Sequence, residues 1–307
     1  MNTDISFNLE NIRIDPAITN CAGVLSTEYE EIEQMVKAGV GIPTTKTLTI
    51  QPREGNKKPR LKQLEFGWLQ SMGLPNPSFR NMEWEKIKSL RKGLIASYTD
   101  KTEKGVEEIA RGIDFFLEGC NFIREFNAAC PNVEGQIMCQ GKELLFRLLR
   151  KIRDATPSRT KLSVKIGLMY EKDLLELIKE MEELEYTFIT TTNSIPCFAI
   201  DIESKKPLIA PKYGGVSGKY IKPISLRQVR IIFENSKLKI IGEGGIYNWR
   251  DAVEYYLAGT SVIGIGSAFL ERPPKTVIDE IKHGTKIFMR EQGFNNLEKM
   301  TGKIDEF

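Results

Sequence analysis

The stretch at residues 238–267, LKIIGEGGIYNWRDAVEYYLAGTSVIGIGS, contains one complete strand–helix–strand unit. Two short apolar runs, 238–242 and 261–264, lead into glycines, and a segment that follows Asn248 joins them. Asparagine is a favourable helix N-cap, and a glycine such as Gly259 commonly follows the end of a helix. This stretch therefore predicts two parallel strands connected by a helix.

The same alternation of a short strand-like run and a longer helix-like run extends outward over the rest of the chain. Further strand-like runs lie at 17–22, 41–46, 93–97, 121–127, 161–166 and 186–193. Apolar residues at helical spacing predict buried helix faces at Leu144, Leu145, Leu148, Leu149 and Ile152, and at Leu174, Ile178, Met181 and Leu184. Thr27 with Glu30 has the spacing of a capping box, and Gly39 is expected to end the helix that follows.

Eight strand–helix units in 307 residues predict an α/β fold of the (β/α)₈ TIM-barrel type, as one domain over residues 1–307. A doubly wound sheet would normally have a GxGxxG turn after its first strand, and none is present there. A short N-terminal β segment at 5–14 is expected to cap the barrel. Two long connections, 48–79 and 195–223, are expected to form lid loops.

Composition excludes several classes of function. The 44 basic and 41 acidic residues leave a net charge of +3, which indicates neither a nucleic-acid partner nor a membrane surface. Five cysteines without a CxxC pair, and no apolar leader or run of roughly 18 apolar residues, predict a soluble cytoplasmic protein. No metal site is expected, and the single histidine, His283, leaves proton transfer to Cys, Lys or a carboxylate.

Chemically capable residues follow the predicted strands at their carboxyl ends, which meet at one mouth of a barrel. They are Lys46, Asn127, Cys130, Lys165, Asn193 and Ser194. A lysine at such a mouth is costly unless it meets an anion or a developing negative charge. The closing glycines, Gly242 to Gly245 and Gly264 to Gly266, lie where barrels of this type bind phosphate, so a phosphorylated cofactor is expected.

Cys130 lies in the segment Asn127-Ala128-Ala129-Cys130-Pro131-Asn132, which leaves a strand for a loop of small and polar residues. A single cysteine is more often buried filler, but this one lies among the residues of the mouth in a chain that is short of histidine. We therefore interpret it as a base. Only a minority of an ordinary thiol, with a pKa of about 8.5, is ionised near neutral pH.

Together these motifs resemble the dihydroorotate dehydrogenase family. The residues that carry the resemblance are Lys46-Thr47, Ser71 to Asn76, Asn127 to Asn132, Val164-Lys165, Asn193-Ser194 and the closing glycines. The cysteine base, the segment Arg53 to Asn56 and the lack of an N-terminal membrane helix are similar to the class 1A enzymes. Those enzymes are soluble homodimers that use fumarate.

The resemblance implies that Cys130 removes a proton from C5 of dihydroorotate while a hydride passes from C6 to N5 of FMN. It implies that Lys165 lies at the pyrimidine edge of the flavin and that Lys46 contacts both flavin and substrate. The residues implied to bind the substrate are Lys46, Gln70, Met72, Gly73, Leu74, Asn127, Asn132, Asn193 and Ser194. Those implied to bind FMN are Ala22, Gly23, Lys46, Thr47, Asn127, Lys165, Thr192, Gly218, Gly244, Gly245, Gly266 and Ser267.

Two departures from the family pattern keep alternatives open. Gln70 stands where the family has an asparagine that helps to bind the substrate, so the ring could be another dihydropyrimidine, or the chain an inactive FMN-binding paralogue. Glu243 would repel phosphate unless its side chain points away from the glycine loop. An NAD-linked enzyme would need a separate subunit with an iron–sulfur cluster and FAD, and a Schiff-base aldolase using Lys46 or Lys165 is a non-flavin alternative.

Overall fold

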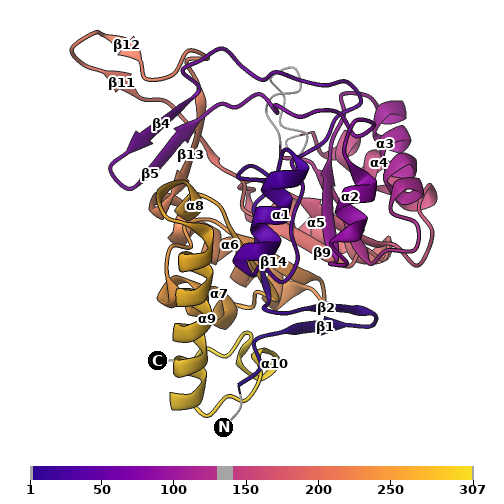
Figure 1. Ribbon diagram of the computed structural model, residues 1–307, viewed down its shortest axis with the longest axis vertical. Coiled ribbons are helices and arrows are strands. Elements are labelled where there is room, and N and C mark those ends of the chain that lie inside the picture. The colour runs from indigo at the N-terminus through magenta and orange to yellow at the C-terminus, as the bar shows by residue number, and fades with distance from the viewer. Residues whose placement is uncertain (1–2, 130–140, 306–307) are drawn as a thin grey trace.

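The computed structural model describes residues 3–129 and 141–305, and its centre is a curled parallel sheet (Figure 1). Seven strands pair in the order β3-β15-β14-β9-β8-β7-β6, each parallel to its neighbours. Their bounds are β3 Ile18–Asn20, β6 Leu94–Tyr98, β7 Phe122–Asn127, β8 Lys161–Lys165, β9 Phe188–Thr191, β14 Lys239–Glu243 and β15 Val262–Ile265. The α/β barrel predicted from the sequence is confirmed.

The segment predicted as the second barrel strand, 41–46, closes the barrel without being a continuous strand. The backbone of Gly41 donates to Ile18 on β3, and Thr45 donates to Ile95 on β6 at 2.9 Å. Thr44 forms only an isolated parallel bridge with Ile95. Pro43 lies between the two donors and has no N–H group to offer, which explains why the ladder is interrupted.

Helices follow the strands and pack around the sheet, as the apolar spacing predicts. Their bounds are α1 Tyr29–Ala38, α2 Trp84–Ser89, α3 Glu103–Phe116, α4 Lys142–Asp154, α5 Glu171–Glu183, α6 Lys222–Asn235, α7 Trp249–Ala258, α8 Ala268–Glu271, α9 Pro274–Glu291 and α10 Leu297–Met300, with a 3₁₀ turn η2 at Lys219–Ile221. The asparagine cap at Asn248 is confirmed, and Gly39 and Gly259 end α1 and α7 with positive φ angles.

Two details of the helix predictions were wrong. Leu144 is 37% exposed, because it lies beside the stripe of α4 that contains the buried Leu145, Leu148 and Leu149. Thr27 and Glu30 form no capping box. The helix begins one residue later, with Glu28 as N-cap, and Glu31 rather than Glu30 accepts the backbone N–H of Thr27, at 2.7 Å.

A hairpin at the N-terminus fills the amino end of the barrel. Strands β1 (Phe7–Leu9) and β2 (Ile12–Ile14) pair antiparallel, as the predicted capping segment requires. Ile12 and Ile14 join a buried apolar cluster with residues from the barrel strands, including Ile123, Phe188 and Ile241. Because this end is packed with apolar side chains, polar chemistry is confined to the opposite, carboxyl end.

The two long connections do not act as separate loops, because they pair with each other. Strands β4 (Leu61–Leu64) and β5 (Gly67–Gln70) come from the first, and β10 (Ile195–Cys197) and β13 (Gly214–Gly218) come from the second. They form an antiparallel sheet in the order β10-β13-β5-β4. A further hairpin, β11 (Ile200–Asp201) with β12 (Lys206–Pro207), projects beyond it (Figure 1).

This lid sheet and the β1–β2 hairpin lie toward opposite ends of the molecule in Figure 1. Among residues 3–129 and 141–305, no helix combines the length and the apolar character that a membrane span requires.

Candidate active site

A cavity of about 750 Å³ lies between the carboxyl ends of the barrel strands and the lid sheet. Its volume is in the range typical of sites that enclose a small molecule or cofactor. The predicted residues that line it are Ala22, Gly23, Lys46, Thr47, Gln70, Met72, Leu74, Asn127, Lys165, Thr192, Asn193, Ser194, Gly218, Gly244, Gly245, Gly266 and Ser267. Gly73 is outside the lining, and Cys130 and Asn132 lie outside the described residues.

Glycines shape one end of the cavity. Gly244 and Gly245 follow β14 with φ angles of +121° and +74°, a region that side-chain-bearing residues rarely adopt. A Cβ at Gly244 would lie 2.5 Å from Oγ of Ser225, so the turn has no room for a side chain. The buried Ser225 Oγ has no hydrogen-bond partner among the described residues. Backbone amides in a turn of this kind suit an anionic group.

Lys165 is held at the carboxyl end of β8 by a buried carboxylate. Its Nζ lies 2.5 Å from Oε2 of Glu243, which ends β14 two strands away, and both side chains are only 5% exposed. Glu243 therefore does not leave an unpaired charge at the glycine turn, which was the concern raised by the sequence. The other mouth lysine, Lys46, is also buried, and its Nζ donates to the carbonyl of Gly23 at 3.4 Å.

Two more titratable groups, Glu125 and Cys21, lie near Lys165. Burial alone would lower the pKa of Lys165, but the carboxylates of Glu243 and Glu125 raise it above its ordinary value. Burial raises the pKa of Glu125, opposed by the charge of Lys165, and Thr190 donates to this carboxyl at 2.6 Å. Burial, reinforced by Glu243, also raises the pKa of Cys21 well above its ordinary value, so this cavity cysteine remains a neutral thiol.

Amide side chains line the cavity beside the lysines. Asn127, the last residue of β7, donates through Nδ2 to Thr47 Oγ1 at 2.9 Å and accepts from the backbone of Ala129 at 3.1 Å. Asn193 donates to the carbonyl of Ala129 at 3.3 Å and accepts from the backbone of Ser194. Each amide is thus fixed in orientation, which is what selective hydrogen bonding to a small polar ring requires.

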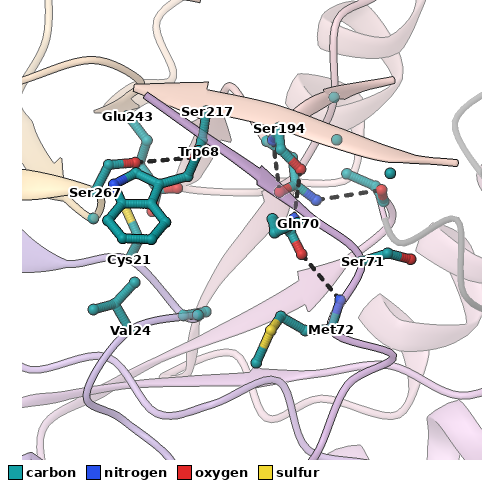
Figure 2. Close-up of a pocket in the computed structure, with 18 of the residues that line it drawn as sticks. Cys21, Val24, Trp68, Gln70, Ser71, Met72, Ser194, Ser217, Glu243 and Ser267 are labelled. Carbon is teal, nitrogen blue, oxygen red and sulfur yellow. Dashed lines mark hydrogen bonds between the residues drawn. The ribbon is translucent and has the colours of Figure 1, made fainter. Parts of the chain in front are cut away.

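Gln70 bridges the two long connections. Its Nε2 donates to Oγ of Ser194 at 2.9 Å, and its Oε1 accepts from the backbone of Met72 at 3.1 Å. Figure 2 shows Gln70 lying between these two partners, at the side of the cavity away from Cys21, Glu243 and Ser267. The longer amide is therefore accommodated by contacts within the protein.

The segment Arg53 to Asn56 holds the adjoining loop, and Asn56 itself lines the cavity. Arg53 donates to the carbonyl of Gly73 at 3.1 Å, and the Asn56 backbone donates to the carbonyl of Met72 at 2.9 Å. A Cβ at Gly73 would lie 2.4 Å from Asn56 Oδ1, so glycine is needed there for close packing. These contacts account for Gly73 without placing it on the cavity surface.

Sequence reasoning missed several residues that line the cavity. Val24, Trp68 and Tyr213 come from connections rather than from strand ends, and Cys21 also lines the cavity. The clearest missed signal is Glu243 beside Gly264 on the neighbouring strand. A Cβ at Gly264 would lie 2.6 Å from Cγ of Glu243, so this glycine leaves the space that the inward carboxylate occupies.

The arrangement defines a (β/α)₈-barrel enzyme with an amide-lined and lysine-lined site at the carboxyl end, and no group of His, Cys, Asp and Glu within its described residues could hold a metal. The family model for dihydroorotate dehydrogenase matches residues 5–289. The chain belongs to the dihydroorotate dehydrogenase family and is a flavin oxidoreductase.

Individual relatives agree with this family over nearly the whole chain. The catalytic subunit of dihydroorotate dehydrogenase B (NAD(+)) from Caldicellulosiruptor saccharolyticus is 31% identical, with 98% of this chain and 99% of the relative covered. A putative dihydroorotate dehydrogenase A (fumarate) from Aeropyrum pernix is 28% identical, with 97% of each chain covered. The chain is therefore similar to relatives named for NAD(+) as well as to one named for fumarate.

A solved structure supports the fold. The crystal structure of DHODH from Eimeria tenella in complex with ferulenol has a TM-score of 0.82 and 19% identity, and the match covers 97% of this chain and 88% of that chain.

The residues of the cavity fit a flavin. At Gly23 an added Cβ would meet no protein atom within 4 Å, so this wall leaves open space against which a flat ring can lie. The glycine turns offer backbone amides at one end, and the cationic side chain of Lys165 lines the interior. A ring and a phosphate thus each have suitable protein groups.

Proposed function

We propose that this chain oxidises dihydroorotate to orotate with FMN as its cofactor. The observation that carries the proposal is one cavity lined by Lys46, Lys165 and the fixed amides of Asn127 and Asn193, with the glycine turns at its end. These groups match the needs of a small anionic ring and a phosphorylated cofactor.

FMN, when bound, supplies the ring that accepts a hydride. The glycines at 244, 245 and 266 would hold its phosphate, and Gly23 would face its ring. Lys165 would stabilise negative charge at the ring edge. The amides of Asn127 and Asn193 would orient the substrate, and Lys46 would attract its carboxylate. Cys130, which lies outside the described residues, is proposed as the base.

An anaerobic absorbance spectrum of the purified, FMN-loaded protein tests this proposal. Adding dihydroorotate is expected to bleach the flavin band. If dihydroorotate does not bleach the yellow protein, the substrate assignment is overturned. Bleaching by a different dihydropyrimidine would favour the second candidate. That candidate, an oxidoreductase for another dihydropyrimidine, is motivated by Gln70, whose side chain donates a hydrogen bond to the Ser194 hydroxyl. A yellow protein that no dihydropyrimidine bleaches would indicate an inactive paralogue.

The electron acceptor has two candidates. The segment from Arg53 to Asn56 resembles the fumarate-using enzymes and holds the lid loop here, while the relative from C. saccharolyticus is named for NAD(+) and as a catalytic subunit. We propose fumarate, as the acceptor that needs no second protein. Recovery of the yellow colour when fumarate is added to the bleached protein would support it. If the yellow colour does not return, the proposed acceptor would instead be NAD, reached through a partner subunit.

Replacing Gly23 with alanine tests where the cofactor lies. Because the added Cβ meets no protein atom within 4 Å, the free energy of unfolding of the cofactor-free protein is expected to stay within about 0.5 kcal/mol. The dissociation constant of FMN is expected to rise at least about tenfold, since the methyl group would occupy the space of the ring. Titration by flavin fluorescence measures it, and unchanged affinity would contradict this placement.

We further propose that the chain forms a homodimer through the projecting arm around β11 and β12. This arm exposes apolar side chains that a monomer would leave in water, among them Phe198 at 44%, Ile200 at 52% and Ile202 at 81% exposure. Light scattering on the same yellow preparation reports the mass. A monomer at micromolar concentration would contradict the dimer.

A further inference from the structure

Glu243 is the one acidic side chain that both lines the cavity and pairs with Lys165, as judged over residues 3–129 and 141–305. It is the last residue of β14, directly before the glycine turn, and it is 4% exposed. The barrel has space for it because Gly264, its partner in the sheet register, has no side chain. The carboxylate is thus built into the wall of the site.

The carboxylate of Glu243 neutralises the positive charge of Lys165 at the cavity wall. Lys165 is the mouth lysine that extends from β8 toward the interior, and its Nζ lies 2.5 Å from the Glu243 carboxylate. Glu125 is buried close enough to this pair to interact with both charges, but it is outside the cavity lining, so it does not face a ligand directly. Cys21, beside Glu243, is neutral because burial raises the pKa of its thiol. The net charge that Lys165 and Glu243 together present is therefore close to zero.

A flavin that accepts electrons gains negative charge on its ring, and nearby positive charge makes this gain easier. An isolated ammonium would thus raise the reduction potential of the flavin, whereas an ammonium neutralised by a carboxylate would raise it less. The carboxylate also fixes the position of the ammonium, since the bond to Glu243 restrains an otherwise flexible side chain.

We propose that Glu243 is a positioning residue that holds Lys165 and lowers the reduction potential of bound FMN. The reduced cofactor is thereby a stronger electron donor to its acceptor than it would be beside an unpaired lysine. This inference rests on the proposed function, because it requires FMN in the cavity.

The Glu243→Gln variant tests the proposal, since it keeps the size of the side chain and removes its charge. The midpoint potential of bound FMN is measured anaerobically against a reference dye at one pH, in parent and variant. We expect a positive shift that corresponds to at least a tenfold change in the ratio of reduced to oxidised FMN, about 30 mV for a two-electron couple. An unchanged or more negative potential would overturn the proposal.

Glu271→Gln is the matched control, because it removes a carboxylate by the same change without touching Lys165. Glu271 accepts hydrogen bonds from Trp68 and Tyr247, each at 2.9 Å. Its variant is expected to keep the potential of the parent protein, and an equal shift in both variants would show a general charge effect and refute a specific role for Glu243.

The dissociation constant of FMN, measured on the same samples, distinguishes failure of the proposed function from failure of the proposed role of Glu243. Parent protein that binds no FMN would overturn the proposed function and this inference together. FMN-loaded protein with no shift on Glu243→Gln would overturn the inference alone.

Discussion

The free energy of unfolding of a Lys165→Met variant is expected to be about 3–5 kcal/mol lower than that of the parent protein. The reason is the ion pair between Lys165 and Glu243, in which both side chains are 5% exposed and the two charged atoms lie 2.5 Å apart. Methionine fills a similar volume but leaves the carboxylate of Glu243 buried without its cation. Removing one partner of a buried pair costs much more than the net contribution of the intact pair.

The double variant Lys165→Met/Glu243→Gln separates this cause from lost packing. It removes both charges, so it is expected to recover a large part of the loss, and coupling between neighbouring sites makes the two changes non-additive. Lys142→Met is the matched control, because the pair of Lys142 with Glu176 is 49% and 35% exposed and is expected to contribute about 0–1 kcal/mol. Urea unfolding of the cofactor-free proteins measures all three. A double variant no more stable than the single one would contradict this account.

The pH dependence follows from the direction of the pKa shift of Lys165. The carboxylates around it raise its pKa in the folded state above its value in the unfolded chain. The stabilisation of the charged form is therefore fully present below the unfolded pKa, about 10.4, and is lost as the pH rises through the higher folded value. The contribution that protonation of Lys165 makes to the stability of the parent protein should therefore stay constant from pH 6 to 9.

The sequence was sufficient to predict the barrel because its strands are local features. Runs such as 121–127 and 161–166 are short and contain apolar residues such as Ile123 and Val164 between helix-like stretches, and the structure has β7 and β8 there. The segment at 41–46 also lies in the barrel wall, but Pro43 breaks its hydrogen-bond ladder. A proline in a strand-like run is the sequence signal for that interruption.

The lid sheet could not be predicted in the same way. Strands β5 and β13 pair Gln70 with Gly215, residues that are far apart in the chain. Such pairing depends on how the barrel brings two connections together, and neither connection alone specifies its partner. The hydrogen bond from Gln70 to Ser194 follows from this pairing, so its partner could not be identified from the sequence.

The partner of Lys165 was missed for a related reason. The sequence placed Glu243 beside a phosphate loop, because it lies between glycines, and only the register of β14 against β15 shows that Gly264 opens space for it inside the barrel. The lysine itself was predictable from its place at a strand end. Its counter-ion required the three-dimensional arrangement of strands that are distant in sequence.

Cys130, the proposed base, gives the second large expected effect. Replacing Cys130 with alanine is expected to lower the turnover of dihydroorotate by about 10²–10⁴-fold, the contribution typical of a general base. Cys130 itself lies outside the described residues, but the chain just before it is anchored in the cavity. The carbonyl of Ala129 accepts from Asn193, and its N–H donates to Asn127.

Cys21, which lines the cavity, is poorly suited to this role. Burial, together with the neighbouring Glu243, raises the pKa of its thiol well above the ordinary value, so little thiolate would form at neutral pH. A thiol with an ordinary pKa, about 8.5, would instead give a turnover that rises from neutral to alkaline pH. A flat profile over that range would argue against a cysteine base.

Cys120→Ala provides the control for Cys130→Ala, because Cys120 lies just before β7 and Cys130 follows the same strand at its other end. Both variants are expected to bind FMN with the affinity of the parent protein, and only Cys130→Ala is expected to lose turnover. Steady-state rates and FMN titrations of the two variants make the comparison. A Cys130→Ala protein that oxidises dihydroorotate at the parental rate would assign the proton transfer to another group.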